Sequence, residues 1–283
     1  MLKGKLAHKR KAVQTILITT FTAVLSLVWW VPLIWMMGVA LSSEGIKTTD
    51  FFRLILPPYT LKYIRSVFEN KNAHMLLWFG NSLLVSVVNV GLMLLLVTFA
   101  AFAFAKIRFK FKEFWFWLVM VSIMIPGEAS MVSSYVLYYN LGLLNTITSL
   151  IIPGIASAFS LLLMKSFIEG IPNDLFEAAM IDGCSRLRMV FVLVIPLTKM
   201  ALASLGIFAF LGAWNNFLWP YMTISEPTRM TVAVGISYFT GQGDTAINTG
   251  MAASLLASVP VLVVFFIFQR QITKGIAFSG LKM

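Results

Sequence analysis

The chain has 283 residues, of which 59% are hydrophobic and only 12% carry a formal charge. A soluble domain normally has about a quarter of its residues charged, so this sequence has too few charges to keep a globular surface hydrated. The net charge is +11, but the Lys and Arg residues lie in short segments between apolar blocks of roughly 20 residues. This distribution excludes a nucleic-acid-binding surface and indicates helices that cross a membrane.

The apolar blocks predict an all-α membrane protein with about six spans. In chain order the spans are expected at residues 13–41, 78–105, 114–139, 147–168, 199–223 and 249–268. The first span follows a basic stretch that resembles the start of a signal peptide. It is too long for a signal sequence and has no convincing cleavage site, so we expect a retained helix. In the third span, Pro126-Gly127 predicts a break.

The segments between the spans predict the orientation of the chain. With the N-terminus in the cytoplasm, sixteen Lys and Arg residues lie inside and six outside, whereas the acidic residues divide five and five with Glu128 within a span. Cytoplasmic segments carry the excess of basic residues, which favours both termini inside. The basic N-terminus and Lys106–Lys112 then act as topology anchors that can contact lipid headgroups. Residues 42–77 form a polar stretch long enough for a small extracytoplasmic subdomain.

One inner segment, residues 165–199, is more than a simple loop. Asp174 followed by Glu177 is a capping-box pattern with Asp174 as N-cap. Gly183 suits the left-handed position that ends a helix, and Ser185 can cap a second helix. The first helix has only about eight residues and is marginal alone, so it needs a surface to dock on. We expect its apolar residues to lie in a groove of another protein: Leu175, Phe176, Ala179 and Met180.

The residues of this segment carry a family resemblance. Glu177-Ala178-Ala179, Gly183 and Leu193-x-Ile195-Pro196 resemble the EAA loop of binding-protein-dependent ABC importer permeases, although the family pattern ends Ile-x-Leu-Pro. Three other stretches resemble the carbohydrate uptake-1 (maltose-type) sugar permeases, specifically the six-span member of the permease pair: Leu141–Thr146, Trp214–Pro220 and the tail from Pro260 through Gln269-Arg270 to Gly275. The resemblance covers most of the chain beyond residue 78.

The resemblance implies an ABC type I importer permease fold, with an anchor helix and outer loop at 1–77 and a core permease domain at 78–283. The EAA loop, at about 172–197, forms a coupling helix that sits in a cleft of a cytoplasmic ATPase in that family. The corresponding residues here are Asp174, Glu177, Ala178, Ala179, Asp182, Gly183 and Pro196.

The implied partners are a second homologous permease, two cytoplasmic ATPase subunits and an extracytoplasmic solute-binding protein, in a prokaryotic cytoplasmic membrane. The chain itself lacks a phosphate-binding loop, because Gly241-Gln242-Gly243 has no lysine after it and is expected on the outer side. ATP and Mg would therefore bind the partner subunits, and this chain is expected to be no enzyme and to bind no cofactor or metal.

Candidate residues for the substrate path lie in the third and fifth spans. Asn side chains can bond sugar hydroxyls and Trp rings can cover C–H faces, which makes Trp214, Asn215, Asn216 and Trp219 candidates. These residues equally suit helix packing or the interfacial belt. Glu128 is a candidate because carboxylates within a span are costly, unless it lies solvated at the interface.

Other functions are open at this stage. The spans offer no Lys or Arg deep in the hydrocarbon, which favours a neutral sugar, but a permease for another solute such as glycerol phosphate is the nearest competitor. An ion-coupled secondary transporter should show internal repeats and several buried carboxylates. A membrane enzyme should show a catalytic constellation, and His8, His74 and Cys184 supply none.

Overall fold

A computed structural model describes residues 2–43, 58–70, 73–239 and 246–280. Within these ranges the regular elements are helices, and the one β contact is an isolated bridge between Ser42 and Tyr59. Part of the expected outer subdomain, namely residues 44–57 and 71–72 of the stretch 42–77, and the Gly241–Gly243 turn lie outside the described residues. The chain divides into two compact units, residues 1–70 with 236–256 and residues 71–235 with 257–283.

The first unit consists of α1 (Leu2–Leu41), α2 (Lys62–Glu69), η7 (Ile236–Phe239) and the start of α14 (Ala246–Gly280). Residues far apart in the sequence meet here. Asn248 of α14 is fully buried and its Nδ2 donates to the carbonyl of Val39, 2.9 Å away. The N–H of Thr60 donates to the carbonyl of Leu41 at 2.7 Å. Both carbonyls belong to the last turn of α1, which has no intrahelical donors for them, so these bonds complete the helix end.

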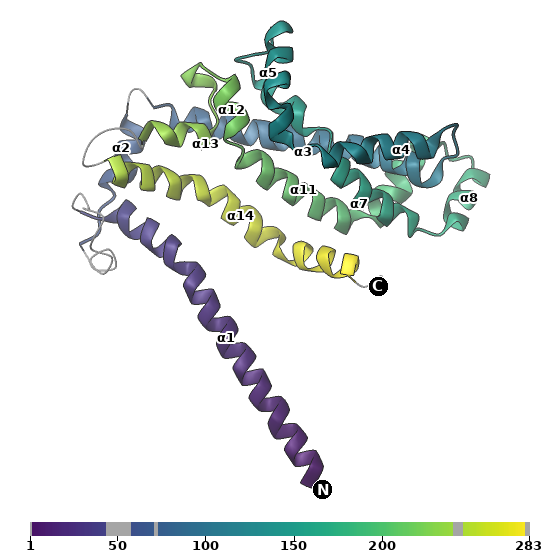
Figure 1. Cartoon of the computed structure of the whole chain (residues 1–283), viewed down its shortest axis with the longest axis horizontal. Helices are drawn as coiled ribbons and strands as arrows, with labels where there is room; N and C mark the ends of the chain where they lie inside the picture. Colours follow the sequence, from purple (N-terminus) through teal and green to yellow (C-terminus); the bar gives the residue numbers. More distant parts are fainter. Residues whose placement is uncertain (1, 44–57, 71–72, 240–245, 281–283) are drawn as a thin grey trace. The chain divides into compact units, whose positions relative to one another are not determined.

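The second unit contains the remaining helices, which Figure 1 shows in sequence colours. They are α3 (Met75–Lys106), α4 (Lys112–Val121), η2 (Ser122–Met124), η3 (Gly127–Ser130), α5 (Met131–Asn140), α6 (Ile147–Ile151), η4 (Ile152–Gly154), α7 (Ala158–Glu169), α8 (Asn173–Ile181), α9 (Arg186–Met189), the π-helix η5 (Val190–Val194), α10 (Ile195–Leu197), α11 (Lys199–Trp214), α12 (Leu218–Thr223), η6 (Pro227–Arg229), α13 (Val232–Gly235) and the rest of α14.

The core of the second unit forms where α3 packs against both α7 and α11. Met93, Val97 and Ala101 recur every four residues along α3, so they share one face of the helix, and each is at most 1% exposed. Buried residues from the partner helices complete this core: Leu161, Met164 and Ile168 of α7, and Ala201 and Leu205 of α11. These three helices therefore form the frame on which the site residues lie.

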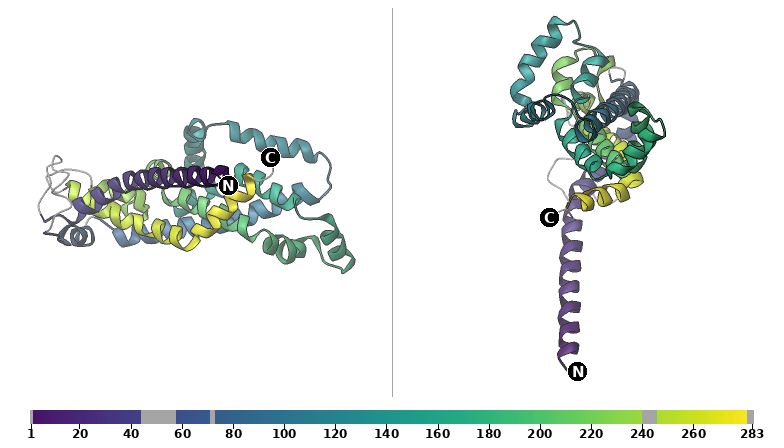
Figure 2. Two further views of the ribbon diagram at one scale, coloured as in Figure 1. Left: turned by 90° about the horizontal axis from the view of Figure 1, so that it is seen from below. Right: turned by 90° about the vertical axis from the view of Figure 1, so that its right-hand side faces the viewer.

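Three of the predicted spans are confirmed as single long apolar helices: Gln14–Leu41, Met75–Lys106 and Ile247–Gln269. Three further helix pairs are apolar enough to cross a membrane if each bent pair counts as one span, so the number of spans lies between three and six. The expected break at Pro126-Gly127 is confirmed, with a bend of 94° between Lys112–Met124 and Gly127–Asn140. Accordingly α5 turns sharply away from α4 in Figures 1 and 2. The cytoplasmic position of the termini stays a prediction.

The expected span at 199–223 is wrong as one continuous helix. α11 ends at Trp214, and the apolar pair joins Arg186–Leu197 to Lys199–Trp214 with a bend of 84°. The backbone N–H and the side-chain amide of Asn215 both donate to the carbonyl of Leu211, at 3.1 and 2.9 Å, and close the last turn of α11. Pro220 has no N–H to donate back to Asn216, and the chain restarts as α12.

Candidate functional site

The helix of the EAA-like segment, α8, begins two residues before the expected position. Its N-cap is Pro172 and its first residue is Asn173, and no side chain caps it. The prediction that Asp174 is the N-cap is therefore wrong. The Oδ1 of Asn173 instead accepts a hydrogen bond from Lys106 Nζ at 2.8 Å. Asp174 lies in the first turn, where its negative charge still favours the positive end of the helix dipole.

The end of α8 confirms the expected turn. Gly183 has a φ of +75°, the left-handed conformation that favours glycine. Its N–H donates to Met180 O at 3.0 Å and the N–H of Cys184 donates to Ala179 O at 2.8 Å, the paired bonds of a Schellman motif. The predicted cap of the next helix is also confirmed, since Ser185 Oγ accepts from the N–H of Arg188 at 3.4 Å.

The sequence alone predicts that the apolar residues of α8 all face outward, toward a partner. In the structure, two of them do not. Phe176 is 5% exposed and packs in the core against Phe102 of α3, with ring centroids 5.8 Å apart. Ala179 is half-buried against the same core. The surface available to a partner consists of the exposed residues Leu175, Glu177, Ala178, Met180, Ile181 and Asp182. Phe176 thus fixes α8 to α3, while the rest of the helix stays accessible.

Pro196 lies in α10, directly after the π-helix Val190–Val194. A proline has no N–H and its ring clashes with the carbonyl four residues earlier, here that of Val192. A π-turn widens the helix by one residue and removes this clash. Thr198 then separates α10 from α11 at the 84° bend. The motif proline therefore helps define the joint between the inner segment and the following span.

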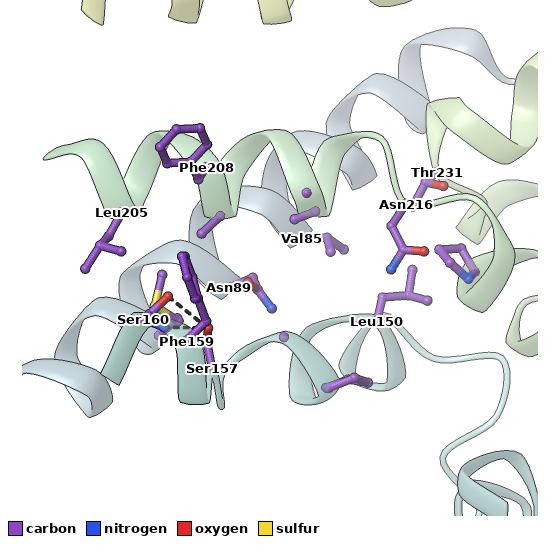
Figure 3. A pocket seen from close by; sticks show the side chains of 17 residues that line it. Val85, Asn89, Leu150, Ser157, Phe159, Ser160, Leu205, Phe208, Asn216 and Thr231 are labelled. Carbon is purple, nitrogen blue, oxygen red and sulfur yellow. Dashed lines mark hydrogen bonds between the residues drawn. The ribbon is translucent and has the colours of Figure 1, made fainter. Parts of the chain in front are cut away.

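A cavity of about 310 Å³ lies in the second unit between α3, the α6–α7 region and α11 (Figure 3). Its lining carries no Lys, Arg, Asp or Glu. The polar side chains that line it are amides and hydroxyls: Asn89, Ser157, Ser160, Asn216 and Thr231. Leu205 and Phe208 line it from α11, and Leu150 from α6, so apolar surface alternates with hydrogen-bonding groups.

Asn89 is the best fixed polar group of this cavity. It is 4% exposed, and its Nδ2 donates to the carbonyl of Ile151 at 2.9 Å, which joins α3 to the end of α6. Its amide lies directly over Gly154, where an added Cβ would be 2.1 Å from Nδ2. Glycine at 154 is therefore required for Asn89 to hold this position. The sequence analysis does not predict this residue, although an amide in the middle of an apolar span is a signal for it.

The candidates from the fifth span separate into two groups. Asn216 lines the cavity, whereas Asn215 is the C-cap of α11 and does not. Trp214 is buried and its Nε1 donates to Ala257 O at 3.2 Å. Trp219 is buried too and donates to Ser149 O at 2.9 Å. Both Trp side chains fill packing positions outside the cavity lining, and a substrate role for them stays a prediction.

Glu128 lies in η3, at the 94° bend, and is exposed. It does not line the cavity. The substrate contact and the solvated alternative both stay predictions. In the part of the chain that the structure describes, no group of three or more His, Cys, Asp and Glu residues is placed to hold a metal ion.

A second pocket, of about 550 Å³, lies at the base of α8 between α3, α4 and α9. Its lining carries four basic residues, Lys106, Arg108, Lys112 and Arg186, and one acidic residue, Glu177. Lys106 Nζ donates to Ile171 O at 2.6 Å and lies 5.1 Å from the ring centroid of Phe176. The second unit therefore carries an uncharged cavity and a strongly basic pocket.

Comparison with known proteins identifies relatives of this chain. The family described as the binding-protein-dependent transport system inner membrane component matches residues 93–278. The arabinooligosaccharides transport system permease protein AraQ of Halalkalibacterium halodurans is 30% identical over 205 residues, which cover 72% of this chain and 74% of that protein. AraQ of Bacillus subtilis is 27% identical over 272 residues, which cover 96% and 97%.

Two further matches bear on the fold and on the alternatives. The sn-glycerol-3-phosphate transport system permease protein UgpE of Shigella flexneri is 35% identical over 161 residues, covering 56% of this chain and 57% of that protein. Among solved structures, the crystal structure of a bacterial ABC transporter involved in the import of the acidic polysaccharide alginate superposes with a TM-score of 0.82. It is 19% identical and covers 91% of this chain and 96% of the matched chain.

These findings confirm the family resemblance and the all-α fold of an ABC importer permease. The family match covers the inner segment with α8, the basic pocket and most of α14, and it covers the lining of the uncharged cavity except Val85 and Asn89. The chain belongs to the family of binding-protein-dependent transport system inner membrane components.

Proposed function

We propose that this permease imports a neutral sugar or oligosaccharide and that the cavity between α3, α7 and α11 is part of the substrate path. The observation that carries the proposal is the composition of its lining, five amide and hydroxyl side chains with no charged residue. Sugars present many hydroxyls and some apolar C–H surface. Such a lining offers hydrogen bonds to the hydroxyls and apolar contact to the C–H surface. The relatives named as arabinooligosaccharide permeases support the same substrate class.

Glycerol phosphate is the second candidate, because UgpE relatives are 35% identical over the matched part. A phosphate ester removed from water needs cationic partners, preferably Arg or Lys. The cavity lining has neither. Since an unpaired buried anion is strongly unfavourable, the cavity favours the neutral substrate.

For the energy source, we infer that α8 docks on a separate ATPase subunit. Glu177, Ala178 and Asp182 are exposed on α8 next to the apolar Leu175, Met180 and Ile181, and the last of these is 86% exposed. Such a surface fits the cleft of a partner that binds ATP and Mg. Closure of two ATPase subunits would move α8 and turn the path of this chain and a second permease outward, and hydrolysis would return it inward. An extracytoplasmic binding protein would deliver the sugar.

The test is uptake by the complete transporter in proteoliposomes that contain ATP. The expected result is ATP-dependent uptake of a radiolabelled neutral oligosaccharide, such as an arabino-oligosaccharide, and no uptake of labelled glycerol 3-phosphate under the same conditions. The matched binding protein must be supplied in each case, since it captures the substrate. Uptake of glycerol 3-phosphate alone would overturn the sugar assignment.

A further inference from the structure

The basic pocket at the base of α8 is not explained by sugar transport. Its lining combines residues from four parts of the second unit: the end of α3, the following connection, the start of α4, and the α8–α9 segment. The pocket has four positive charges against the one negative charge of Glu177. In the described part of the chain, Arg108, Lys112 and Arg186 form no ion pair. The structure therefore holds an excess of positive charge without a counterion of its own.

The pocket is also partly apolar, which narrows the class of anion that it fits. Phe102, Ala105 and Ile107 line it from α3 and the adjoining connection, and Phe176, Met180 and Met189 line it from the α8–α9 segment. A small hydrated anion such as free phosphate gains nothing from these surfaces. A molecule with an anionic group next to hydrocarbon can use both kinds of wall.

The position of the pocket along α3 also favours a molecule that has an anionic group next to hydrocarbon. Lys106 is the last residue of the apolar helix Met75–Lys106. The end of a membrane-spanning helix lies at the level of the lipid headgroups, where their phosphates are found. Basic pockets between helices on the cytoplasmic side are suited to phospholipid headgroups. The predicted orientation places this end of α3 in the cytoplasm.

We propose that this pocket binds the phosphate group of an anionic phospholipid, with Arg108, Lys112 and Arg186 as its charged partners. The lipid phosphate balances the charge between α4 and α9, and the start of its acyl region covers the apolar wall. Lys106 already holds α8 to α3 through Asn173 Oδ1 and Ile171 O. The bound lipid thereby joins the α4 side of the pocket to the segment that contains the predicted coupling helix.

The experiment compares two double variants of the full chain that remove the same charges. Lys112→Gln with Arg186→Gln removes two basic residues that line the pocket. The control variant, Lys110→Gln with Arg188→Gln, also removes one Lys and one Arg. Each lies two residues from its counterpart in the pocket variant, and neither lines the pocket. Native mass spectrometry of the detergent-purified chain measures the retained dioleoylphosphatidylglycerol, with dioleoylphosphatidylcholine as the uncharged comparison.

The wild type is expected to prefer phosphatidylglycerol over phosphatidylcholine. The pocket variant should lose affinity for phosphatidylglycerol by about fivefold for each removed charge, or about 25-fold in total, whereas the control variant changes by less than about twofold. Equal losses in both variants would show a diffuse attraction and overturn the site, as would no loss in the pocket variant. Release of the lipid by low-millimolar inorganic phosphate would assign the pocket to a soluble phosphate and overturn the lipid as its occupant.

Discussion

The two pockets of the second unit share a helix but have opposite chemistry. Asn89 of α3 lines the uncharged cavity, and Lys106 of the same helix lines the basic pocket at the base of α8. Seventeen residues separate them along the sequence, or about 25 Å along a straight helix. The helix thus carries hydrogen-bonding groups at one level and charge at the other. Under the proposed function, substrate recognition and coupling to the energy source are separate functions at two levels of the same helix.

The largest effect is expected from reversing the charge of Glu177. In Glu177→Lys, the lysine faces the partner surface that we propose for α8 and adds a fifth positive charge to the basic pocket. Reversal of a charge at an interface costs several kcal/mol, so ATP-driven uptake should fall below roughly a tenth of the wild-type rate. The chain should still be inserted in the membrane, because Glu177 is exposed and makes no core contact. Uptake in proteoliposomes and the amount of chain in the membrane are the two measurements.

Glu113→Lys is the matched control for this variant. Glu113 is also exposed and lies in the first turn of α4, outside α8 and outside the lining of either pocket. The variant Glu113→Lys makes the same change of charge as Glu177→Lys. Because it lies outside α8 and both pockets, uptake should stay close to that of the wild type. If Glu177→Lys transported normally, the coupling role of α8 would be refuted. If both variants failed alike, the loss would reflect net charge rather than the helix.

A second effect, of intermediate size, is expected from Gly154→Ala in the uncharged cavity. The new Cβ would lie 2.1 Å from Asn89 Nδ2, so the amide must move and its hydrogen bond with Ile151 O is lost. An unmade hydrogen bond of a buried polar group costs about 1–3 kcal/mol. We expect a lower melting temperature of the purified chain and an uptake rate reduced about tenfold. Binding-protein-stimulated ATPase activity of the complex should fall with uptake, since both require the substrate path.

Gly212→Ala provides the control within the same cavity. Gly212 also lines it, but an added Cβ would meet no atom within 4 Å, and the residue lies inside α11. Alanine is favoured over glycine in a helix by about 0.5–1 kcal/mol, so this variant should be at least as stable as the wild type. A melting temperature that fell equally in both variants would contradict the role of the Asn89–Gly154 contact.

The sequence predicts the local turns of the EAA-like segment better than it predicts the cavity. Gly183 and Ser185 act as expected because turn and cap preferences are local properties of a few neighbouring residues. The side to which Phe176 points depends on α3, which is some 70 residues away in the sequence, so no local pattern indicates it. The prediction for Asp174 is wrong because α8 already begins after Pro172, which leaves Asp174 inside the first turn.

The cavity shows the same limit more strongly. Its lining comes from helices that are distant in sequence. Asn89 can hold its position only because residue 154 is a glycine, and the sequence does not show that these two residues are in contact. The Trp residues were attractive candidates by type, but Trp214 and Trp219 use their N–H groups to join helices. Chemistry alone cannot distinguish a packing Trp from one that contacts a substrate. The structure adds the partners of the two indole N–H groups, and a substrate contact by either Trp stays a prediction.

The smallest effect is expected from Asn216→Ala, and it separates the two neighbouring amides. Asn216 lines the cavity, so its loss removes one hydrogen-bonding group from the proposed path. A hydrogen bond contributes about 0.5–1.5 kcal/mol, which corresponds to a rise of about twofold to thirteenfold in the apparent KM for uptake. The maximal rate should change little, because α8 and the basic pocket are untouched.

Asn215→Ala removes the adjacent amide, which bonds Leu211 O at the end of α11 and does not line the cavity. Its expected consequence is a small loss of stability with an unchanged KM, because the carbonyl of Leu211 also accepts from the backbone N–H of residue 215 at 3.1 Å. Both amides are exposed, so neither variant leaves a large void. A higher KM in Asn215→Ala than in Asn216→Ala would place the substrate on the other side of this helix end, and the uncharged cavity would then lose its role in recognition.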